Sequence, residues 1–317
     1  MQILLLKKLQ QQFDMKKTLV WILLITGVFV SCTSSKTAVS NQNSKMVAEF
    51  DKQGHRGCRG LYPENTIPAM LHALGLGVTT LELDVVITKD KKVVLSHDPY
   101  FNHEISTKPN GDAVTESEEK TLRIYGMNYD EVKSFDVGMK KHPRFPDQVK
   151  IPAYKPLLSD LIDSVKKDMM TRRRPFPFYN IETKSLPKTD GVNHPAPAEF
   201  VELIVGVIKE KQIEDFVIIQ SFDIRTLQYL HQHYPTIKTA LLIENTDKRG
   251  LGKQLEQLGF TPSIYSPAYQ LVNEKLIQDC HAQSMKIIPW TVNTKELIEK
   301  YTLMGADGLI SDYPNLF

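Results

Sequence analysis

Apolar runs rich in β-branched residues alternate with stretches of helical periodicity from about residue 46 to the end of the chain. Short apolar runs bounded by turn residues are typical of strands, whereas apolar residues spaced three and four apart are typical of helices. The predicted strands are VAEFDKQ, TTLELDVVI, KVVLS, FYNIETK, DFVIIQSF, KTALLIE, SIYSPA, KIIPWTV and DGLISD. The predicted helices span residues 65–76, 157–169, 198–210, 224–233, 253–258, 272–282 and 295–304.

The order of these elements predicts an α/β fold with a parallel sheet. If KVVLS is the return arm of a hairpin, eight strands remain, and a helix follows each of the first seven. Strict alternation requires right-handed crossovers between parallel strands. Eight such units match the TIM (β/α)8 barrel, of typically ~250 residues. An open doubly wound sheet is the alternative, but no dinucleotide or nucleoside-triphosphate glycine motif follows the first strand.

One region interrupts the alternation. Residues 99–156 carry charged and turn-forming runs such as STKPNGDAVTESEEK. We expect a small insertion after the second strand and its hairpin, at the mouth of the barrel, where it can select the substrate.

The first 31 residues have the pattern of a secretory signal peptide. Lys16 and Lys17 precede the apolar run LVWILLITGVFV, which is too short to span a bilayer comfortably. The small residue before Cys32 resembles a lipobox, although Phe29 stands where Leu is usual. We therefore expect lipidation at Cys32, a tether over 32–46, a barrel over 47–317, and Met15 as a possible true start. The protein would be exported to the cell envelope and membrane-anchored, in the periplasm or at the outer membrane.

The charge of the chain bears on its partners, and its cysteine content bears on disulfide bonds. Removing residues 1–31 leaves 35 basic and 36 acidic residues, so the mature chain is not basic. The cluster 172–174 is expected to be a solvated helix end, and we predict no nucleic-acid partner and no obligate protein partner. Cys58 and Cys280 are expected to be free thiols, because two cysteines do not make a disulfide framework.

Candidate chemistry is concentrated between residues 54 and 98, in the segments GHRGCRGLYPENT, LELDVV and VVLSHD. Alternate residues of a strand share a face, so Glu82 and Asp84 point together into the barrel. Glu182 and Lys184 repeat this spacing in NIETK. Charged groups inside a barrel are costly unless they are compensated, so these positions indicate a site rather than a core.

Three carboxylates at one mouth require a cation before a phosphodiester can bind. Glu82, Asp84 and Glu182 offer the oxygen ligands that Mg²⁺ or Ca²⁺ prefers, and no zinc-type Cys/His spacing is present. Three carboxylates, one divalent ion, Arg56 and Lys184 together carry a formal charge of about +1, which suits a monoanionic diester. A structural ion-pair network is the alternative.

His55 and His97 end the first strand and the hairpin arm, so both can reach the same mouth. Imidazole accepts or donates a proton near neutral pH, and two histidines can therefore act as base and acid. The other histidines, for example His72, His142, His194 and His231, lack such neighbours and are expected to be surface or core residues.

The segments HRGCRGLYPENT, ELD, SHD, NIETK, QSF, PWTVN and GADGLISDYP together resemble the signature segments of the glycerophosphodiester phosphodiesterase family, in the family's order. The resemblance implies a TIM barrel that hydrolyses deacylated phospholipids, such as glycerophosphocholine or glycerophosphoethanolamine, to glycerol 3-phosphate and an alcohol. It also implies roles by position: His55 and His97 as the acid/base pair; Glu82, Asp84 and Glu182 as metal ligands; Arg56 and Lys184 on the phosphate; Glu64 supporting the metal or the glycerol hydroxyls; Phe222 and Trp290 walling the glycerol pocket.

Two other functions remain open at this stage. A phospholipase C or D type enzyme on the same barrel would use similar histidines but would need an apolar rim for acyl chains. A lipoprotein that binds a phosphodiester without cleaving it would not need an acid/base pair. The sequence does not distinguish Mg²⁺ from Ca²⁺, nor the alcohol released, nor water from a glycerol hydroxyl as nucleophile.

Overall fold

Eight parallel strands and one antiparallel strand form a single sheet in the computed structural model, which describes residues 50–317. The strands are β1 (Asp51–Gly54), β2 (Thr80–Ile87), β3 (Val93–Leu95), β4 (Phe178–Thr183), β5 (Val217–Ser221), β6 (Lys238–Ile243), β7 (Ile264–Pro267), β8 (Lys286–Ile287) and β9 (Gly308–Ser311). The order across the sheet is β8-β7-β6-β5-β4-β2-β1-β9, and β3 pairs antiparallel with β2. The predicted hairpin and the parallel order are confirmed.

The sheet nearly closes into a barrel. Backbone hydrogen bonds join its two ends, from Asp307 to Ile287, from Ile310 to Pro289 and from Val292 to Ile310, at 2.9–3.1 Å. Strand β8 has two residues instead of the predicted seven, because Pro289 has no N–H to donate to a ladder. A single bridge between Ala268 and Trp290 continues the pairing. The TIM barrel prediction is confirmed.

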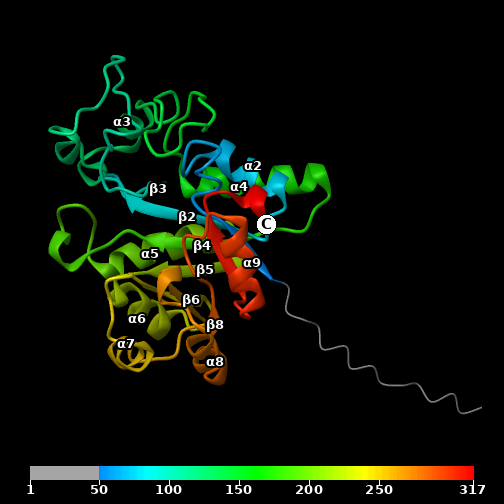
Figure 1. Ribbon diagram of the computed structural model, residues 1–317. Helices are drawn as coiled ribbons and strands as arrows, with labels where there is room; N and C mark the ends of the chain where they lie inside the picture. The colour runs from blue at the N-terminus through cyan, green and yellow to red at the C-terminus, as the bar shows by residue number, and fades with distance from the viewer. Residues whose placement is uncertain (1–49) are drawn as a thin grey trace, which may run out of the picture. The chain divides into compact units, whose positions relative to one another are not determined.

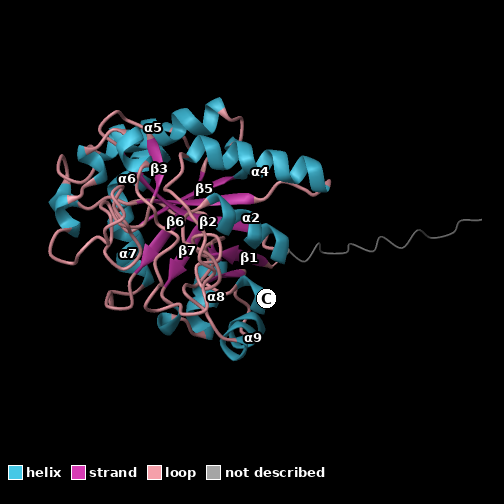
Figure 2. Ribbon diagram, turned by 90° about the horizontal axis from the view of Figure 1, so that it is seen from above, coloured by secondary structure: helices cyan, strands magenta, loops and turns pink. Residues whose placement is uncertain are grey.

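Helices surround the strands (Figure 2). They are α2 (Ile67–Leu76), α4 (Leu158–Arg172), α5 (Pro197–Glu210), α6 (Ile224–His233), α7 (Leu251–Leu258), α8 (Glu274–Ala282) and α9 (Lys295–Leu303), one in each connection between successive parallel strands. Leu81, Leu83 and Val85 of β2 pack in the cluster between the sheet and these helices. Helix α4 ends at Arg172, and residues 172–174 are exposed, as expected.

The region between β3 and α4 is a small insertion with its own core (Figure 1). It holds one short helix, α3 (Tyr129–Lys133), and otherwise turns and 3-10 segments. Phe101 and Phe135 stack at 3.8 Å between ring centroids, and they pack with Val86 and Val94 of the hairpin. The insertion is thereby fixed to the strand that carries the candidate carboxylates.

The barrel interior is divided into an apolar and a polar half. Ile218, Ala240, Ile264, Ile288 and Ile310 fill one half. In the other half, the buried Asn180 amide donates to Gln53 at 2.8 Å and to Gln220 at 2.9 Å. This polar half is the floor of the site described below.

Two further sequence predictions concern other parts of the chain. Cys58 and Cys280 are both free and buried, as expected. The proposed leader, the tether and Cys32 lie outside the described residues. Within residues 50–317 no helix is both long and apolar enough to cross a membrane.

Candidate active site

Three carboxylates meet on two neighbouring parallel strands. Glu82 and Asp84 lie on β2, and Glu182 lies on β4 directly opposite Asp84 in the ladder. One oxygen from each carboxylate lies within 4.8 Å of the others, and all three side chains are buried. The geometry therefore brings together the three predicted metal ligands.

Neighbouring side chains hold two of the three carboxylates in place. The Gln220 amide donates to Glu82 Oε1 at 2.6 Å, and the Asn65 amide donates to Asp84 Oδ2 at 2.8 Å. The Gln220 amide oxygen itself accepts from Asn180, so the polar half of the barrel interior orients Glu82.

Burial and nearby charges shift the pKa values of the three carboxyl groups, and a bound cation would relieve the repulsion among them. Burial, followed by repulsion from Asp84, raises the pKa of Glu82 well above its ordinary value. Burial also raises the pKa of Glu182 to about 7, with repulsion from Asp84 acting against attraction by Lys184. Burial alone would raise the pKa of Asp84 too, but Arg56 and Lys184 together hold it well below its usual range.

The donor set also fits a hard divalent cation. The Oδ1 atom of Asp84 is buried and accepts no hydrogen bond from any described residue, and Lys184 Nζ is 3.7 Å away. A buried anionic oxygen without a partner is costly. Ca²⁺ or Mg²⁺ bound by Glu82, Asp84 and Glu182 would satisfy it with the ligand type that both ions prefer.

His55 directly follows β1 and carries a carboxylate on one ring nitrogen. Its Nδ1 lies 2.6 Å from Asp312 Oδ1, and its Nε2 lies 4.0 Å from Glu82. Arg59 at 3.1 Å and the Asn293 amide at 2.7 Å hold Asp312 in turn. Burial outweighs Asp312 and lowers the pKa of His55 to about 4.

Sequence reasoning missed the role of Asp312. The segment GADGLISDYP was noted only for its resemblance to the family, yet Asp312 directly follows β9, which pairs with β1. The sequence did hold a signal for this contact. Asp312 follows the last predicted strand and His55 follows the first, and these two strands are neighbours in a closed barrel.

His97 repeats this arrangement with a local partner. Its Nδ1 lies 3.1 Å from Asp98 Oδ1, and the Asn102 amide donates to the other Asp98 oxygen at 2.8 Å. Burial, followed by the positive charges of Arg56 and Lys184, lowers the pKa of His97. Each predicted catalytic histidine thus has its Nδ1 engaged by a carboxylate.

Arg56 occupies a turn between β1 and α2 in the left-handed region, with φ of 50°. Its backbone N–H donates to Glu82 at 2.7 Å, and its guanidinium lies 2.8 Å from Glu64 and 3.3 Å from Asp84. Glu64 therefore contacts Arg56, and it is not one of the three clustered carboxylates. Lys184 Nζ lies 2.7 Å from Glu182 and 3.7 Å from Asp84.

A cavity of about 530 Å³ opens over these groups. Phe222 and Trp290 form part of its wall, edge to face at 5.6 Å between centroids. The predicted site residues that line it are His55, Arg56, Glu82, His97, Glu182, Lys184, Phe222 and Trp290. Arg59, Arg144 and His194 are among the other residues that line it, and His194 is buried, in line with its expectation as a surface or core residue.

Comparisons with known proteins agree on the family. The model of the "Glycerophosphoryl diester phosphodiesterase family" matches residues 55–316. The chain belongs to this family. It is 29% identical to a glycerophosphodiester phosphodiesterase from Bacillus altitudinis, covering 82% of this chain and 94% of the relative. It is 30% identical to one from Caldanaerobacter subterraneus, with 82% and 93% covered.

Solved structures show the same fold. A Silicibacter pomeroyi protein matches with TM-score 0.75 and 27% identity, covering 84% of this chain and 91% of that one. An Oleispira antarctica phosphodiesterase, solved with the product sn-glycerol-3-phosphate, matches with TM-score 0.65 and 22% identity, with 84% and 94% covered. The protein is thus a phosphoric diester hydrolase with glycerophosphodiester phosphodiesterase activity, which rules out the non-catalytic lipoprotein alternative.

Proposed function

We propose that this member of the family hydrolyses glycerophosphodiesters such as glycerophosphocholine or glycerophosphoethanolamine to glycerol 3-phosphate and an alcohol. The reaction would use one divalent cation, Ca²⁺ or Mg²⁺, and the histidines His55 and His97. One observation carries the proposal: a buried carboxylate trio with an unpartnered Asp84 oxygen lies in one cavity with two histidines, each bonded through Nδ1 to a carboxylate. The Oleispira antarctica enzyme, of the same fold, was solved with the product proposed here.

The charges in the cavity suit a phosphodiester. Glu82, Asp84 and Glu182 would hold the cation, which when bound polarises a phosphoryl oxygen and neutralises developing negative charge. Arg56 and Lys184 flank the trio and would hold the non-bridging oxygens. Glu64 would keep the Arg56 guanidinium in place through the contact at 2.8 Å.

The two histidines would move the protons. With Nδ1 held by Asp312 or Asp98, the Nε2 atom of each ring is left for the reaction. One histidine accepts the proton of the attacking water or glycerol hydroxyl, and the other donates a proton to the departing alkoxide. Phe222 and Trp290 would pack against the carbon skeleton of the glycerol.

A panel of glycerophosphodiesters, scored for glycerol 3-phosphate with and without chelator, tests the proposal. We expect turnover that the chelator abolishes and that added Ca²⁺ or Mg²⁺ restores. His55→Ala and His97→Ala should each lose about 100-fold or more of kcat. Full turnover in excess chelator would overturn the metal assignment, and substantial activity in either alanine variant would overturn the acid/base assignment.

A second candidate substrate is a lysophospholipid or intact lipid. Leu186 lines the main cavity with 57% of its surface exposed, so an apolar chain could leave the cavity along it. A mouse lysophospholipase D is 26% identical over 82% of this chain. Assays of lysophosphatidylcholine and phosphatidylcholine beside glycerophosphocholine separate these activities, and release of choline from the deacylated form alone would exclude the second candidate.

We also propose export and anchoring through lipid on Cys32. The support is the leader pattern of residues 1–31, and stable anchoring requires more than one acyl chain. Metabolic labelling with a radioactive fatty acid should mark the wild-type protein and not Cys32→Ser. Equal labelling of both, or none in either, would overturn the anchor.

A further inference from the structure

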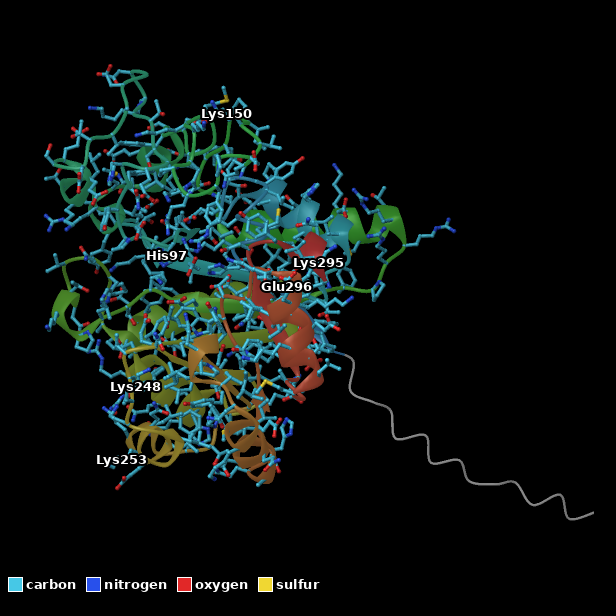
Figure 3. The ribbon with its side chains drawn as sticks, in the orientation of Figure 1. His97, Lys150, Lys248, Lys253, Lys295 and Glu296 are labelled. Carbon is cyan, nitrogen blue, oxygen red and sulfur yellow. The ribbon has the colours of Figure 1, made fainter. Side chains whose placement is uncertain are left out.

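A smaller cavity of about 100 Å³ adjoins the main one on the side of the insertion. The two cavities share four lining residues, Arg56, Arg59, His97 and Arg144. Figure 3 shows His97 at the boundary between the insertion and the barrel. A water molecule needs roughly 10–15 Å³ of such space, so this second cavity can hold several waters or a three-carbon polyol.

The charges around the second cavity balance. Three guanidinium groups and three carboxylates line it: Arg56, Arg59, Arg144, Glu64, Asp98 and Glu104. Glu64 is paired with Arg56 at 2.8 Å and Glu104 with Arg144 at 3.1 Å, while Asp98 lies 3.1 Å from His97. A cavity with balanced charge and many donors and acceptors suits an uncharged, hydroxyl-bearing ligand better than an ion.

His142 adds a donor that no described residue uses. Its side chain is 2% exposed, and its Nδ1 accepts the backbone N–H of Arg144 at 3.1 Å. The neutral ring therefore carries its hydrogen on Nε2, which is buried without a partner. Burial lowers the pKa of His142, which favours this neutral form. A buried donor without a partner, on a residue that lines a polar cavity, indicates a missing acceptor.

The second cavity lacks the features of a choline site. No phenylalanine, tyrosine or tryptophan is among the described residues that line it. Quaternary ammonium groups are bound through aromatic faces, and a cavity of balanced charge offers no net attraction for a cation. Its outer edge is the Arg144–Glu104 pair, whose side chains are 56% and 27% exposed, and such pairs open at little cost.

We infer that the second cavity binds the alcohol that leaves, and that it selects headgroups with vicinal hydroxyls, such as glycerol, over choline. This inference rests on the proposed function. The glycerol phosphate half of the substrate lies against Phe222 and Trp290, and the headgroup crosses His97 into the second cavity, where His142 Nε2–H donates to a headgroup hydroxyl.

This placement of the substrate decides which histidine is the acid and which is the base. The bond between phosphorus and the headgroup oxygen breaks beside His97, so His97 Nε2 gives its proton to that oxygen. The nucleophile forms the new bond to phosphorus and gives its proton to His55. His142 touches only the headgroup and is a specificity-determining residue.

The test compares glycerophosphoglycerol with glycerophosphocholine, using the metal-loaded enzyme. We expect kcat/KM to be about 10-fold or more higher for glycerophosphoglycerol. Equal values or a preference for choline would overturn the inference and leave the proposed function standing. Hydrolysis of neither substrate would overturn both.

Variants of His142 test the residue itself. His142→Leu should lower kcat/KM for glycerophosphoglycerol about 3- to 10-fold, mainly through KM, and should reduce the preference by the same factor. His142→Gln, which keeps an N–H donor, should recover part of that preference even if the leucine variant fails to fold. The matched control is His231→Leu, on the exposed face of α6. An equal loss on both substrates, or an unchanged preference in both His142 variants, would overturn the assignment.

Discussion

At the scale of residues, the site depends on carboxylates that act through another group. Asp312 and Asp98 each hold the Nδ1 atom of one histidine, and Glu64 holds the Arg56 guanidinium. A carboxylate on Nδ1 sets both the tautomer and the orientation of an imidazole. These residues can therefore affect the reaction without touching the substrate.

Asp312→Asn tests this role. We expect kcat to fall about 100-fold with little change in KM, because the amide no longer fixes the tautomer of His55. The pH dependence of kcat should shift as well, which a purely structural defect would not cause. Steady-state kinetics across pH are the measurement.

The matched control is Asp307→Asn. Asp307 also pairs with a histidine, His281, at 2.9 Å, but it lies outside both cavities. Its variant should keep full kcat. Unchanged kcat in Asp312→Asn would show that Asp312 does not position His55.

Glu64 should make the fold sensitive to acid. Burial alone would raise its pKa, but Arg56 and Arg59 outweigh burial and lower the pKa of Glu64 to about 2. Because the folded-state pKa lies below the unfolded value, the stabilisation is present above about pH 5 and is lost as the pH falls toward 2. A shift of this size corresponds to about 3 kcal/mol for this buried group.

Urea unfolding of wild type and Glu64→Gln between pH 3 and 7 measures this contribution. The variant should be less stable at pH 7, with a shallower loss of stability toward pH 3. Glu299→Gln, on the exposed side of α9, is the control and should follow wild type. Parallel curves for Glu64→Gln and wild type would contradict the prediction.

At the scale of elements, the turn between β1 and α2 places the Arg56 side chain among the carboxylates. Gly57 takes a φ of +86°, and a Cβ built on it would lie 2.8 Å from the backbone of Ala69 in α2. Close packing of this turn on the helix therefore requires glycine.

Gly57→Ala should destabilise the fold by roughly 2–4 kcal/mol, from backbone strain and overpacking together. Gly206→Ala is the matched control, because Gly206 is exposed in the middle of α5 and a Cβ there meets nothing within 4 Å. It should stabilise by about 0.5–1 kcal/mol. Thermal and urea unfolding check both, and a neutral Gly57→Ala would refute the packing argument.

At the scale of the whole molecule, a bound cation would link β2 to β4 through three buried carboxylates. A ligand that binds only the folded state stabilises by about 2.7 kcal/mol at 100 times its Kd. For a domain of this size we expect Tm to rise by about 5–10 °C on adding Ca²⁺ or Mg²⁺ to chelator-treated protein.

Asp84→Asn should remove that rise, whereas Asp307→Asn should retain it. Calorimetry with and without metal gives both values without relying on turnover. An equal rise in Asp84→Asn would place the cation elsewhere.

The sequence alone determined the order of strands and helices and the faces on which Glu82, Asp84 and Glu182 lie. Strand periodicity and the alternation of elements are local properties, so they can be read without the fold. His55 and His97 were also predicted from the sequence, because each lies in a short motif at the end of a predicted strand. The predicted length of β8 was wrong. Pro289 interrupts the hydrogen-bond ladder, and which residues pair in that ladder is decided only when the sheet forms.

Tertiary structure alone decided which distant groups act together. Asp312 lies 257 positions from His55, and only closure of the barrel places β9 beside β1. The insertion folds back so that Arg144 and His142 border a second cavity beside His97, and no local pattern predicts that contact. Burial then sets which polar atoms are left without partners, because that depends on every neighbour in three dimensions.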